Sequence, residues 1–293
     1  MIKISTSDIK KLRGLTGAGF LDCKEALDNS NSNIEKAIDF LRKKGISTAQ
    51  KKGDRTASEG LIAITKNNSN KEAGIIEINS ETDFVARNDD FQNFVSNLSI
   101  INLKQKSNLD KLMKSEYSDT KEKVSDALTN LISKIGENLT IRRSNFISIT
   151  NGFIGAYVHN VEKDLMGKIG VLISVETNIE FPVINDFLKK ICMHIAASNP
   201  ISLYLSDIDK DILKKEKDFQ LEEIKKSGKD KSIQEKILVG KMNKYFNEVV
   251  LFEQNFVMDN NIKIKQFIEN TSKELNGSIK IKEFIRFKVG EGI

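Results

Sequence analysis

Apolar residues near the start of the chain recur at a helical spacing and predict three short helices within residues 1–54. Residues 5–7 are candidate N-caps of the first helix, and the basic residues and glycine at 42–45 are expected to end the third. The polar residues 51–55 are expected to form a linker. The pattern therefore predicts a small bundle of three helices, whose apolar stripes are Ile9, Leu12 and Leu15; Leu21, Ala26 and Leu27; and Ile34, Ala37, Ile38 and Leu41.

Beyond this bundle the chain repeats an order of strand, turn, strand and helix. The strand segments are rich in β-branched residues, and each pair is followed by apolar residues at a helical spacing. This repeat predicts two related α+β subdomains, at residues 55–149 and 150–293. The matching features are strands 60–64 and 152–156, strands 74–78 and 170–174, and the pairs Glu81-Thr82 and Glu176-Thr177.

Each copy is expected to close with a further strand, at 139–143 in the first and 279–285 in the second. Before that strand, the first copy has a lysine-rich helical stretch at 109–135, and the second has a longer insertion at 207–251. Apolar seams on both sides of a polar pivot at 226–232 predict that the insertion is an antiparallel helical hairpin. A solvated hairpin and an interaction arm fit this pattern equally well.

Composition narrows the function classes. The 293 residues carry 46 Lys and Arg against 41 Asp and Glu, a formal net charge of +5 that does not require a nucleic-acid partner. The pI of 8.9 and the lysine runs leave a basic RNA-binding module acting at the ribosome as the alternative function. Apolar runs are too short to span a membrane, and residues 1–8 turn polar at once, unlike a secretory signal. We therefore expect a cytoplasmic protein.

Residues suited to catalysis or metal binding are scarce. The sequence has two cysteines, Cys23 and Cys192, and two histidines, His159 and His194. None of the four lies in a metal-binding or hydrolase motif. We expect Cys192 and His194 to be buried in a helix and His159 to lie in a polar turn. The glycine-rich residues 14–19 complete neither phosphate-binding motif and are interpreted as a turn between helices. The sequence thus predicts no enzyme, cofactor or metal site.

Residues 79–88 are the segment of the chain in which polar and apolar residues are most closely interspersed. Thr82 or Asp83 is placed to cap a helix that follows a strand. Phe84 falls on a helical stripe with Phe91 and Val95, which favours a core position. The alternative is an exposed aromatic residue on a turn, which is typical of a binding hot spot. The pattern alone leaves both interpretations open.

Several blocks of the sequence resemble the bacterial elongation factor Ts family. They lie in the family's order, span nearly the whole chain, and include a highly specific TDFVAR motif. Family members commonly continue past the terminal GEGI motif into a further helix, whereas this sequence stops at Ile293, and the turn at 160–167 is longer than expected. The blocks are 12–13 (LR), 16–19 (TGAG), 22–27 (DCKEAL), 77–87 (EINSETDFVAR), 134–138 (KIGEN), 141–143 (IRR), 193–198 (MHIAAS) and 284–292 (FIRFKVGEG).

This resemblance implies a guanine nucleotide exchange factor that binds elongation factor Tu in its GDP-bound and nucleotide-free forms. It implies no covalent chemistry, no cofactor and no direct contact with nucleic acid, and it leaves self-association through the hairpin open. The implied fold has an N-terminal three-helix module resembling ubiquitin-associated domains, two related core subdomains, and a helical hairpin inserted in the second.

The resemblance also implies roles for particular residues. Asp83 and Phe84 would enter the partner's nucleotide-binding domain near its magnesium and phosphate site, which reverses the core interpretation of Phe84. His159 would help to contact the partner's third domain. The full set of implied partner-binding residues is Arg13, Phe20, Leu21, Thr82, Asp83, Phe84, Val85 and His159.

Overall fold

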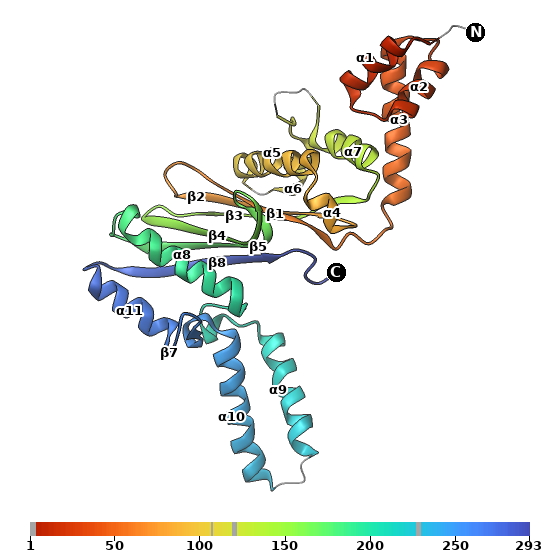
Figure 1. Ribbon diagram of the computed structural model, residues 1–293. Helices are drawn as coiled ribbons and strands as arrows, with labels where there is room; N and C mark the ends of the chain where they lie inside the picture. The colour runs from red at the N-terminus through yellow and green to blue at the C-terminus, as the bar shows by residue number, and fades with distance from the viewer. Residues whose placement is uncertain (1–3, 107, 119–121, 227–229) are drawn as a thin grey trace.

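The computed structural model describes residues 4–106, 108–118, 122–226 and 230–293 as an α+β protein. Figure 1 shows a group of N-terminal helices, a body of strands covered by helices, and two long helices that project from the body. The helices are α1 (Thr6–Thr16), α2 (Phe20–Asn29), α3 (Ile34–Lys52), α4 (Asp83–Ala86), α5 (Asp89–Gln105), α6 (Leu109–Lys114), α7 (Val124–Ile135), α8 (Phe181–Ser198), α9 (Lys210–Lys225), α10 (Lys231–Val249) and α11 (Ile264–Glu274), with short 3₁₀ helices η1 (Leu205–Asp207) and η2 (Leu251–Glu253). The strands are β1 (Glu59–Lys66), β2 (Glu72–Ser80), β3 (Leu139–Ser148), β4 (Gly152–Lys163), β5 (Met166–Thr177), β6 (Asn255–Phe256), β7 (Asp259–Lys263) and β8 (Ile279–Lys288).

The three predicted N-terminal helices form and bury a small core of their own. Ser5 caps α1 by accepting a hydrogen bond from the Asp8 N–H, and Asn33 caps α3 in the same way. α1 ends at Gly17, whose φ of +68° is a left-handed conformation that favours glycine. Residues 14–19 therefore contain a helix end and a turn, as predicted. The core of this module is Ile9, Leu12, Cys23, Ala26, Leu27 and Ala37.

Two helix boundaries differ from the prediction. α3 does not end at Gly45 but continues to Lys52, because this half of the helix packs along α7, where Gly45 faces Ser133. Tertiary contact thus overrides the weak helix propensity of glycine. The stretch expected to be helical at 109–135 is divided into α6 and α7, with an isolated bridge between Glu116 and Lys123 in the segment that joins them. Residues 119–121 of that stretch lie outside the described part.

The strands predicted in both copies are confirmed, and they belong to one six-stranded sheet. In the first copy β2 lies between β1 and β3, and in the second β5 lies between β4 and β8, with antiparallel pairing throughout. The start of β5 also pairs with β1, where Ala63 is opposite Met166, so that the two groups of strands are continuous.

Equivalent glycines begin the two copies. Gly60 and Gly152 have φ values of +129° and +135°, which side chains with a Cβ rarely adopt. A Cβ on either residue would collide with the carbonyl oxygen of the neighbouring strand, at Ile78 or Val175. Both positions therefore require glycine for the same steric reason, which supports the predicted repeat.

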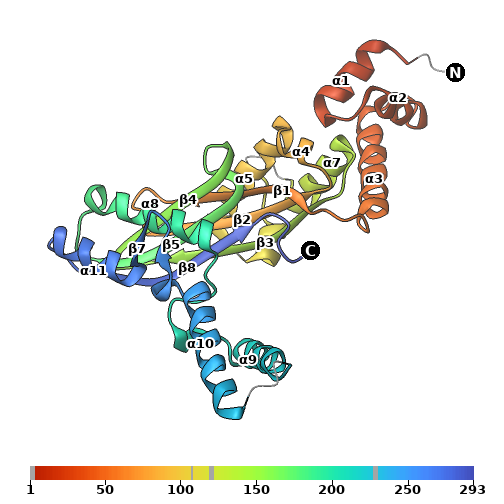
Figure 2. The same ribbon diagram turned by 60° about the horizontal axis from the view of Figure 1, so that its bottom comes forward.

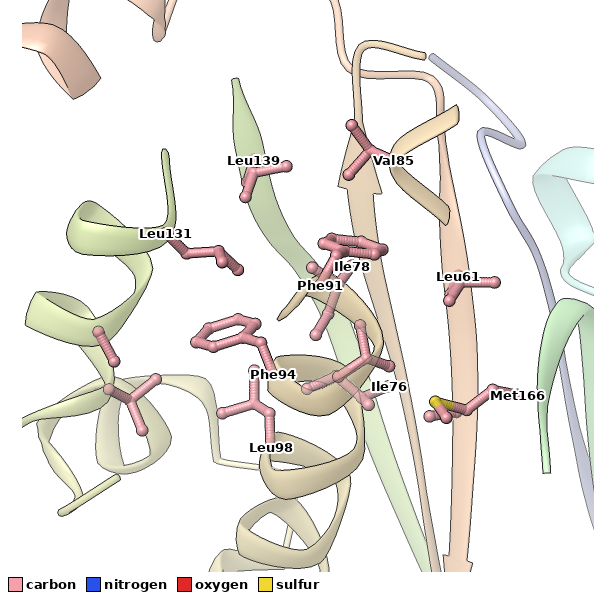
Figure 3. Close-up of a cluster of buried hydrophobic side chains, with 14 of the residues drawn as sticks. Leu61, Ile76, Ile78, Val85, Phe91, Phe94, Leu98, Leu131, Leu139 and Met166 are labelled. Carbon is pink, nitrogen blue, oxygen red and sulfur yellow. The ribbon is translucent and has the colours of Figure 1, made fainter. Parts of the chain in front are cut away.

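The two groups of strands stack against each other and carry helices on their outer faces. Leu61 and Ala63 of β1 point toward α5 and α7 in the cluster that Figure 3 shows, whereas Ile62 and Ile64 point the other way. These residues meet side chains of the second group such as Leu172. The outer face of the second group is covered by α8 and α11. Burial on both faces explains why these strands are almost continuously apolar.

His159 lies in strand β4 and not in a turn, so that prediction is wrong. β4 continues to Lys163, and β5 begins at Met166, which leaves a short tip at residues 164–165. His159 is opposite Ile169 in this ladder. Main-chain pairing is insensitive to side-chain polarity, so a ribbon with exposed polar residues still forms.

The insertion in the second copy forms the predicted antiparallel pair, α9 and α10, which projects away from the body in Figures 1 and 2. The expected pivot at 226–232 includes residues 227–229, which lie outside the described part. Among the described residues, no helix has the length and apolar character needed to cross a membrane.

His194 and Cys192 are buried in α8, as expected. The Val257 N–H donates to His194 Nδ1 (3.3 Å), so the Nε2–H of the neutral ring donates to Gln254 Oε1 (2.8 Å). Gln254 in turn donates to the carbonyl oxygen of Glu248 in α10 (2.6 Å). This network attaches the base of the hairpin to the body, and burial lowers the pKa of His194.

Candidate partner-binding site

The TDFVAR motif forms a sharp turn between the sheet and α5. β2 ends at Ser80, and Thr82, whose backbone is extended, is the N-cap of the single-turn helix α4. A new helix starts almost at once, because Asn88 caps α5 by accepting a hydrogen bond from the Phe91 N–H (3.2 Å). Figure 1 shows that α4 lies at the end of the sheet from which α3 rises.

Phe84 projects from α4 and is 79% exposed, whereas Val85 and Ala86 beside it are buried. Figure 3 shows Val85 at the edge of the cluster that contains Phe91. The exposed position of Phe84 agrees with the interpretation that the family resemblance implied. The helical stripe that favoured a core position does not continue from Phe84 to Phe91, because Asn88 begins a new helix. Val85 occupies the core instead. An exposed aromatic ring on a turn anchored by its neighbours is typical of a protein-binding hot spot.

Thr82 is held by Glu137, a residue that follows α7 and is distant in the sequence. The Thr82 hydroxyl donates to Glu137 Oε1 (2.6 Å), and the Thr82 N–H donates to Glu137 Oε2 (3.0 Å). One carboxylate therefore binds both donors of Thr82. Thr82 makes no side-chain capping bond within α4, although threonine at this position often does.

Glu81 makes the reciprocal contact. Its Oε1 accepts the Asn138 N–H (2.6 Å), so each loop donates a backbone amide to a carboxylate of the other loop. The buried Asn138 side chain also donates to the carbonyl oxygen of Arg55 (2.7 Å), in the segment that leaves α3. Sequence reasoning assigned no role to Glu137 or Asn138. The signal was present, because both lie in the KIGEN block.

Asp83 and Arg87 complete the exposed surface of this turn. Asp83 is exposed directly before Phe84, where its carboxylate offers only hydrogen-bond acceptors. Arg87 Nε lies 3.6 Å from Glu162 Oε2 near the tip of the β4–β5 ribbon. The second copy of the repeat therefore reaches the site through this ion pair.

The predicted N-terminal site residues form a separate exposed group. Arg13, Phe20 and Leu21 are all exposed, and Leu21 is 78% exposed. Leu15 of the first apolar stripe is exposed as well. Leu21 and Ile38 of the other two apolar stripes are exposed too, because the small core is filled by other positions of the three helices. The exposure of Leu21 leaves it accessible, as its implied role in partner binding requires.

A cleft of about 750 Å³ lies between the N-terminal helices and the core helices α5 and α7. Across this cleft, Arg42 of α3 forms an ion pair with Asp126 of α7 (3.0 Å). Within the N-terminal module, Lys44 donates to Asp22 (2.7 Å) and Glu25 (2.5 Å), and these hydrogen bonds raise the pKa of Lys44. The module is thus tied to the body by α3, its contact with α7 and an exposed ion pair.

His159 is exposed on β4, three residues before Glu162. Its Nδ1 is 3.0 Å from the Tyr157 hydroxyl. The structure therefore places Asp83 and Phe84, the N-terminal residues and His159 on the surface, with Thr82 half-buried. Val85, which was also predicted to contact the partner, is buried in the core and is not accessible in the free protein. In the described part of the chain, no group of three or more His, Cys, Asp or Glu side chains is arranged to hold a metal ion.

Comparison with known proteins agrees with the resemblance of the sequence blocks. A family model described as Elongation factor TS matches residues 81–291. An elongation factor Ts from Bartonella bacilliformis is 41% identical over 292 residues, covering 100% of this chain and 94% of that protein. Those from Rhodospirillum centenum and Clostridium botulinum are each 40% identical, over 293 and 290 residues, covering 100% and 99% of this chain and 95% and 94% of those proteins.

These matches and the α+β fold define the protein as a translation elongation factor. The chain belongs to the elongation factor Ts family.

Proposed function

We propose that this protein binds elongation factor Tu in its GDP-bound form and accelerates the release of GDP, so that GTP replaces it. The observation that carries the proposal is the 79% exposure of Phe84 on a turn whose adjoining residues, Val85 and Ala86, are buried. In this role Phe84, with Asp83 beside it, enters the partner near its magnesium and phosphate site and disrupts that site. Family membership favours this function over the RNA-binding alternative.

The mechanism requires differential binding and no covalent chemistry. The protein must bind the partner more tightly without GDP and magnesium than with them, because a ligand with equal affinity for both states shifts nothing. By linkage, the factor by which GDP weakens this complex is the factor by which the complex weakens GDP binding. The protein therefore acts as an exchange factor, in the cytoplasm where translation takes place.

The size of Phe84 suits this requirement. Burying a phenylalanine side chain of about 150 Å² at ~25 cal/mol/Å² supplies up to ~4 kcal/mol, or about a thousandfold in affinity. Since Phe84 is 79% exposed in the free protein, most of this burial is still to be gained on binding. It promotes exchange only where the ring is buried in the nucleotide-free complex and not in the GDP complex.

The other exposed groups are proposed as further contacts. Arg13, Phe20 and Leu21 would bind the nucleotide-binding domain of the partner, and His159 would bind its third domain. We propose that the three N-terminal helices are related to ubiquitin-associated domains and form a unit of residues 1–54, followed by subdomains at 55–149 and 150–293. The separate N-terminal core and the equivalent glycines of the two copies support this division.

The test is the rate of GDP release from elongation factor Tu, measured by stopped-flow fluorescence with a labelled GDP. The Phe84→Ala variant should fold normally but slow the accelerated release by at least tenfold, because most of the burial energy is lost. Phe219→Ala is a matched control, since Phe219 is also exposed (58%) but lies on the projecting hairpin. An unchanged rate with Phe84→Ala, or an equal loss in both variants, would refute the wedge role.

A further inference from the structure

The orientation of Phe84 depends on residues outside its own helix. α4 has four residues, far fewer than an isolated helix needs to be stable in water. Its position is therefore set by tertiary contacts. Val85 and Ala86 anchor it to the core beneath, and Thr82 anchors its N-terminal end to Glu137.

Glu137 is suited to this anchoring because it uses both carboxylate oxygens on a single residue. Hydrogen bonds to a charged acceptor are about twice as strong as neutral ones. The pair of bonds to the Thr82 hydroxyl and N–H restricts rotation of Thr82, two residues before Phe84. The Thr82 hydroxyl donates to Glu137 and makes no side-chain capping hydrogen bond within α4, so its side chain serves the long-range contact and not a local cap.

Glu137 is itself fixed on both sides. Gly136 before it ends α7 in a left-handed conformation, with a φ of +85°. Asn138 after it donates its N–H to Glu81 and its side-chain Nδ2–H to the Arg55 carbonyl oxygen. A carboxylate on so constrained a backbone segment is a rigid support and not a flexible surface side chain.

We propose that Glu137 is a positioning residue for nucleotide exchange, which holds Thr82 so that Phe84 is presented in its partner-binding orientation before the partner arrives. This inference rests on the proposed function. Its physical basis is preorganisation: a loop that is already in its bound conformation loses less conformational entropy on binding. Glu137 acts through Thr82 and needs no contact with the partner for this role.

The test compares Glu137→Ala, Glu137→Gln, Thr82→Val and the double variant Thr82→Val/Glu137→Ala in the GDP-release assay, over a range of concentrations below saturation. Glu137→Ala should lower the accelerated rate by at least tenfold, because it removes both hydrogen bonds to Thr82 and losing one hydrogen bond to a charged group is already worth about tenfold. Glu137→Gln should have a smaller effect, because it keeps an acceptor oxygen. Asp186→Ala, which breaks an exposed ion pair with Lys190 on α8, is the control.

A double-mutant cycle separates positioning from independent effects. If Glu137 acts through Thr82, the double variant should be no slower than Glu137→Ala alone. Amide hydrogen exchange should be faster in Glu137→Ala at Arg87 and Asn88, whose N–H groups donate to the carbonyl oxygens of Phe84 and Val85 in α4, with the rest of the protein unchanged. If Glu137→Ala does not fold, the Glu137→Gln variant decides the question by the same two measurements.

Three results would overturn the inference. They are a wild-type release rate for a folded Glu137 variant, multiplicative losses in the double variant, and unchanged amide exchange at Arg87 and Asn88. The first of these, together with slow release by Phe84→Ala, would reject the role of Glu137 and leave the proposed function intact. A normal rate for Phe84→Ala itself would reject the proposed function and this inference together.

Discussion

Glu77 is the most deeply buried acidic residue at the junction of the two copies, and its replacement should destabilise the protein strongly. The side chain is fully buried in β2 and accepts hydrogen bonds from Arg142 Nη1 (3.0 Å), Arg143 Nε (2.6 Å), Asn79 Nδ2 (3.1 Å) and the Gly290 N–H (2.9 Å). These donors come from β2, β3 and the segment after β8. Glu77 therefore joins the end of the second copy to the first.

The expected magnitude follows from what the Glu77→Gln variant leaves behind. Glutamine keeps the volume, but its amide group would direct N–H donors at other donors, and the charge that balances two guanidinium groups is lost. Breaking a fully buried ion pair costs about 3–5 kcal/mol. Since Arg142 and Arg143 are 23% and 31% exposed, water compensates them in part, and we expect about 3 kcal/mol.

Urea unfolding followed by circular dichroism measures this difference. Glu176→Gln is a matched control, because Glu176 pairs with Lys282 at 3.2 Å on the surface, where both side chains are nearly half exposed. Such exposed pairs contribute about 0–1 kcal/mol. A loss for Glu77→Gln no larger than that of the control would refute the reasoning, and would mean that the buried network adds no net stability.

Two further predictions concern the helices. Gly45→Ala should raise the free energy of unfolding by about 0.5–1 kcal/mol, because alanine favours the interior of α3. The new Cβ would lie 3.7 Å from Ser133 Cβ, which is an ordinary contact. A decrease in thermal or urea stability would contradict this prediction. The second prediction concerns pH: burial lowers the pKa of His194, so near this pKa the folded state binds fewer protons than the unfolded state. The stability that the neutral ring contributes is present above about pH 6.5, the usual pKa of an unfolded histidine, and is lost as the pH falls below that value. The loss of unfolding free energy between about pH 7 and pH 5 should therefore be smaller in His194→Gln, and an equal loss in both proteins would contradict this assignment.

Much of the fold follows from local pattern. Buried strands such as β1 and β5 are read from continuous apolar, β-branched runs, and the repeat is read from glycines that recur in front of them. Helix starts follow from side chains that cap within a few residues, as Ser5 and Asn33 do. The family blocks likewise identify the Phe84 turn from contiguous residues. These features depend on neighbours in the sequence, so the sequence determines them by itself.

Interruptions of the local period and long-range contacts decided the rest. Local pattern favoured a core position for Phe84, ended α3 at Gly45 and put His159 in a turn. In the folded protein Asn88 begins a new helix after Phe84. α7 packs against α3 and lets that helix continue past Gly45, and pairing with β5 keeps His159 in a strand. Each outcome depends on a neighbour or a packing partner whose effect no local period describes. The anchoring of Thr82 by Glu137 is the clearest case, because only the tertiary structure brings those two loops together.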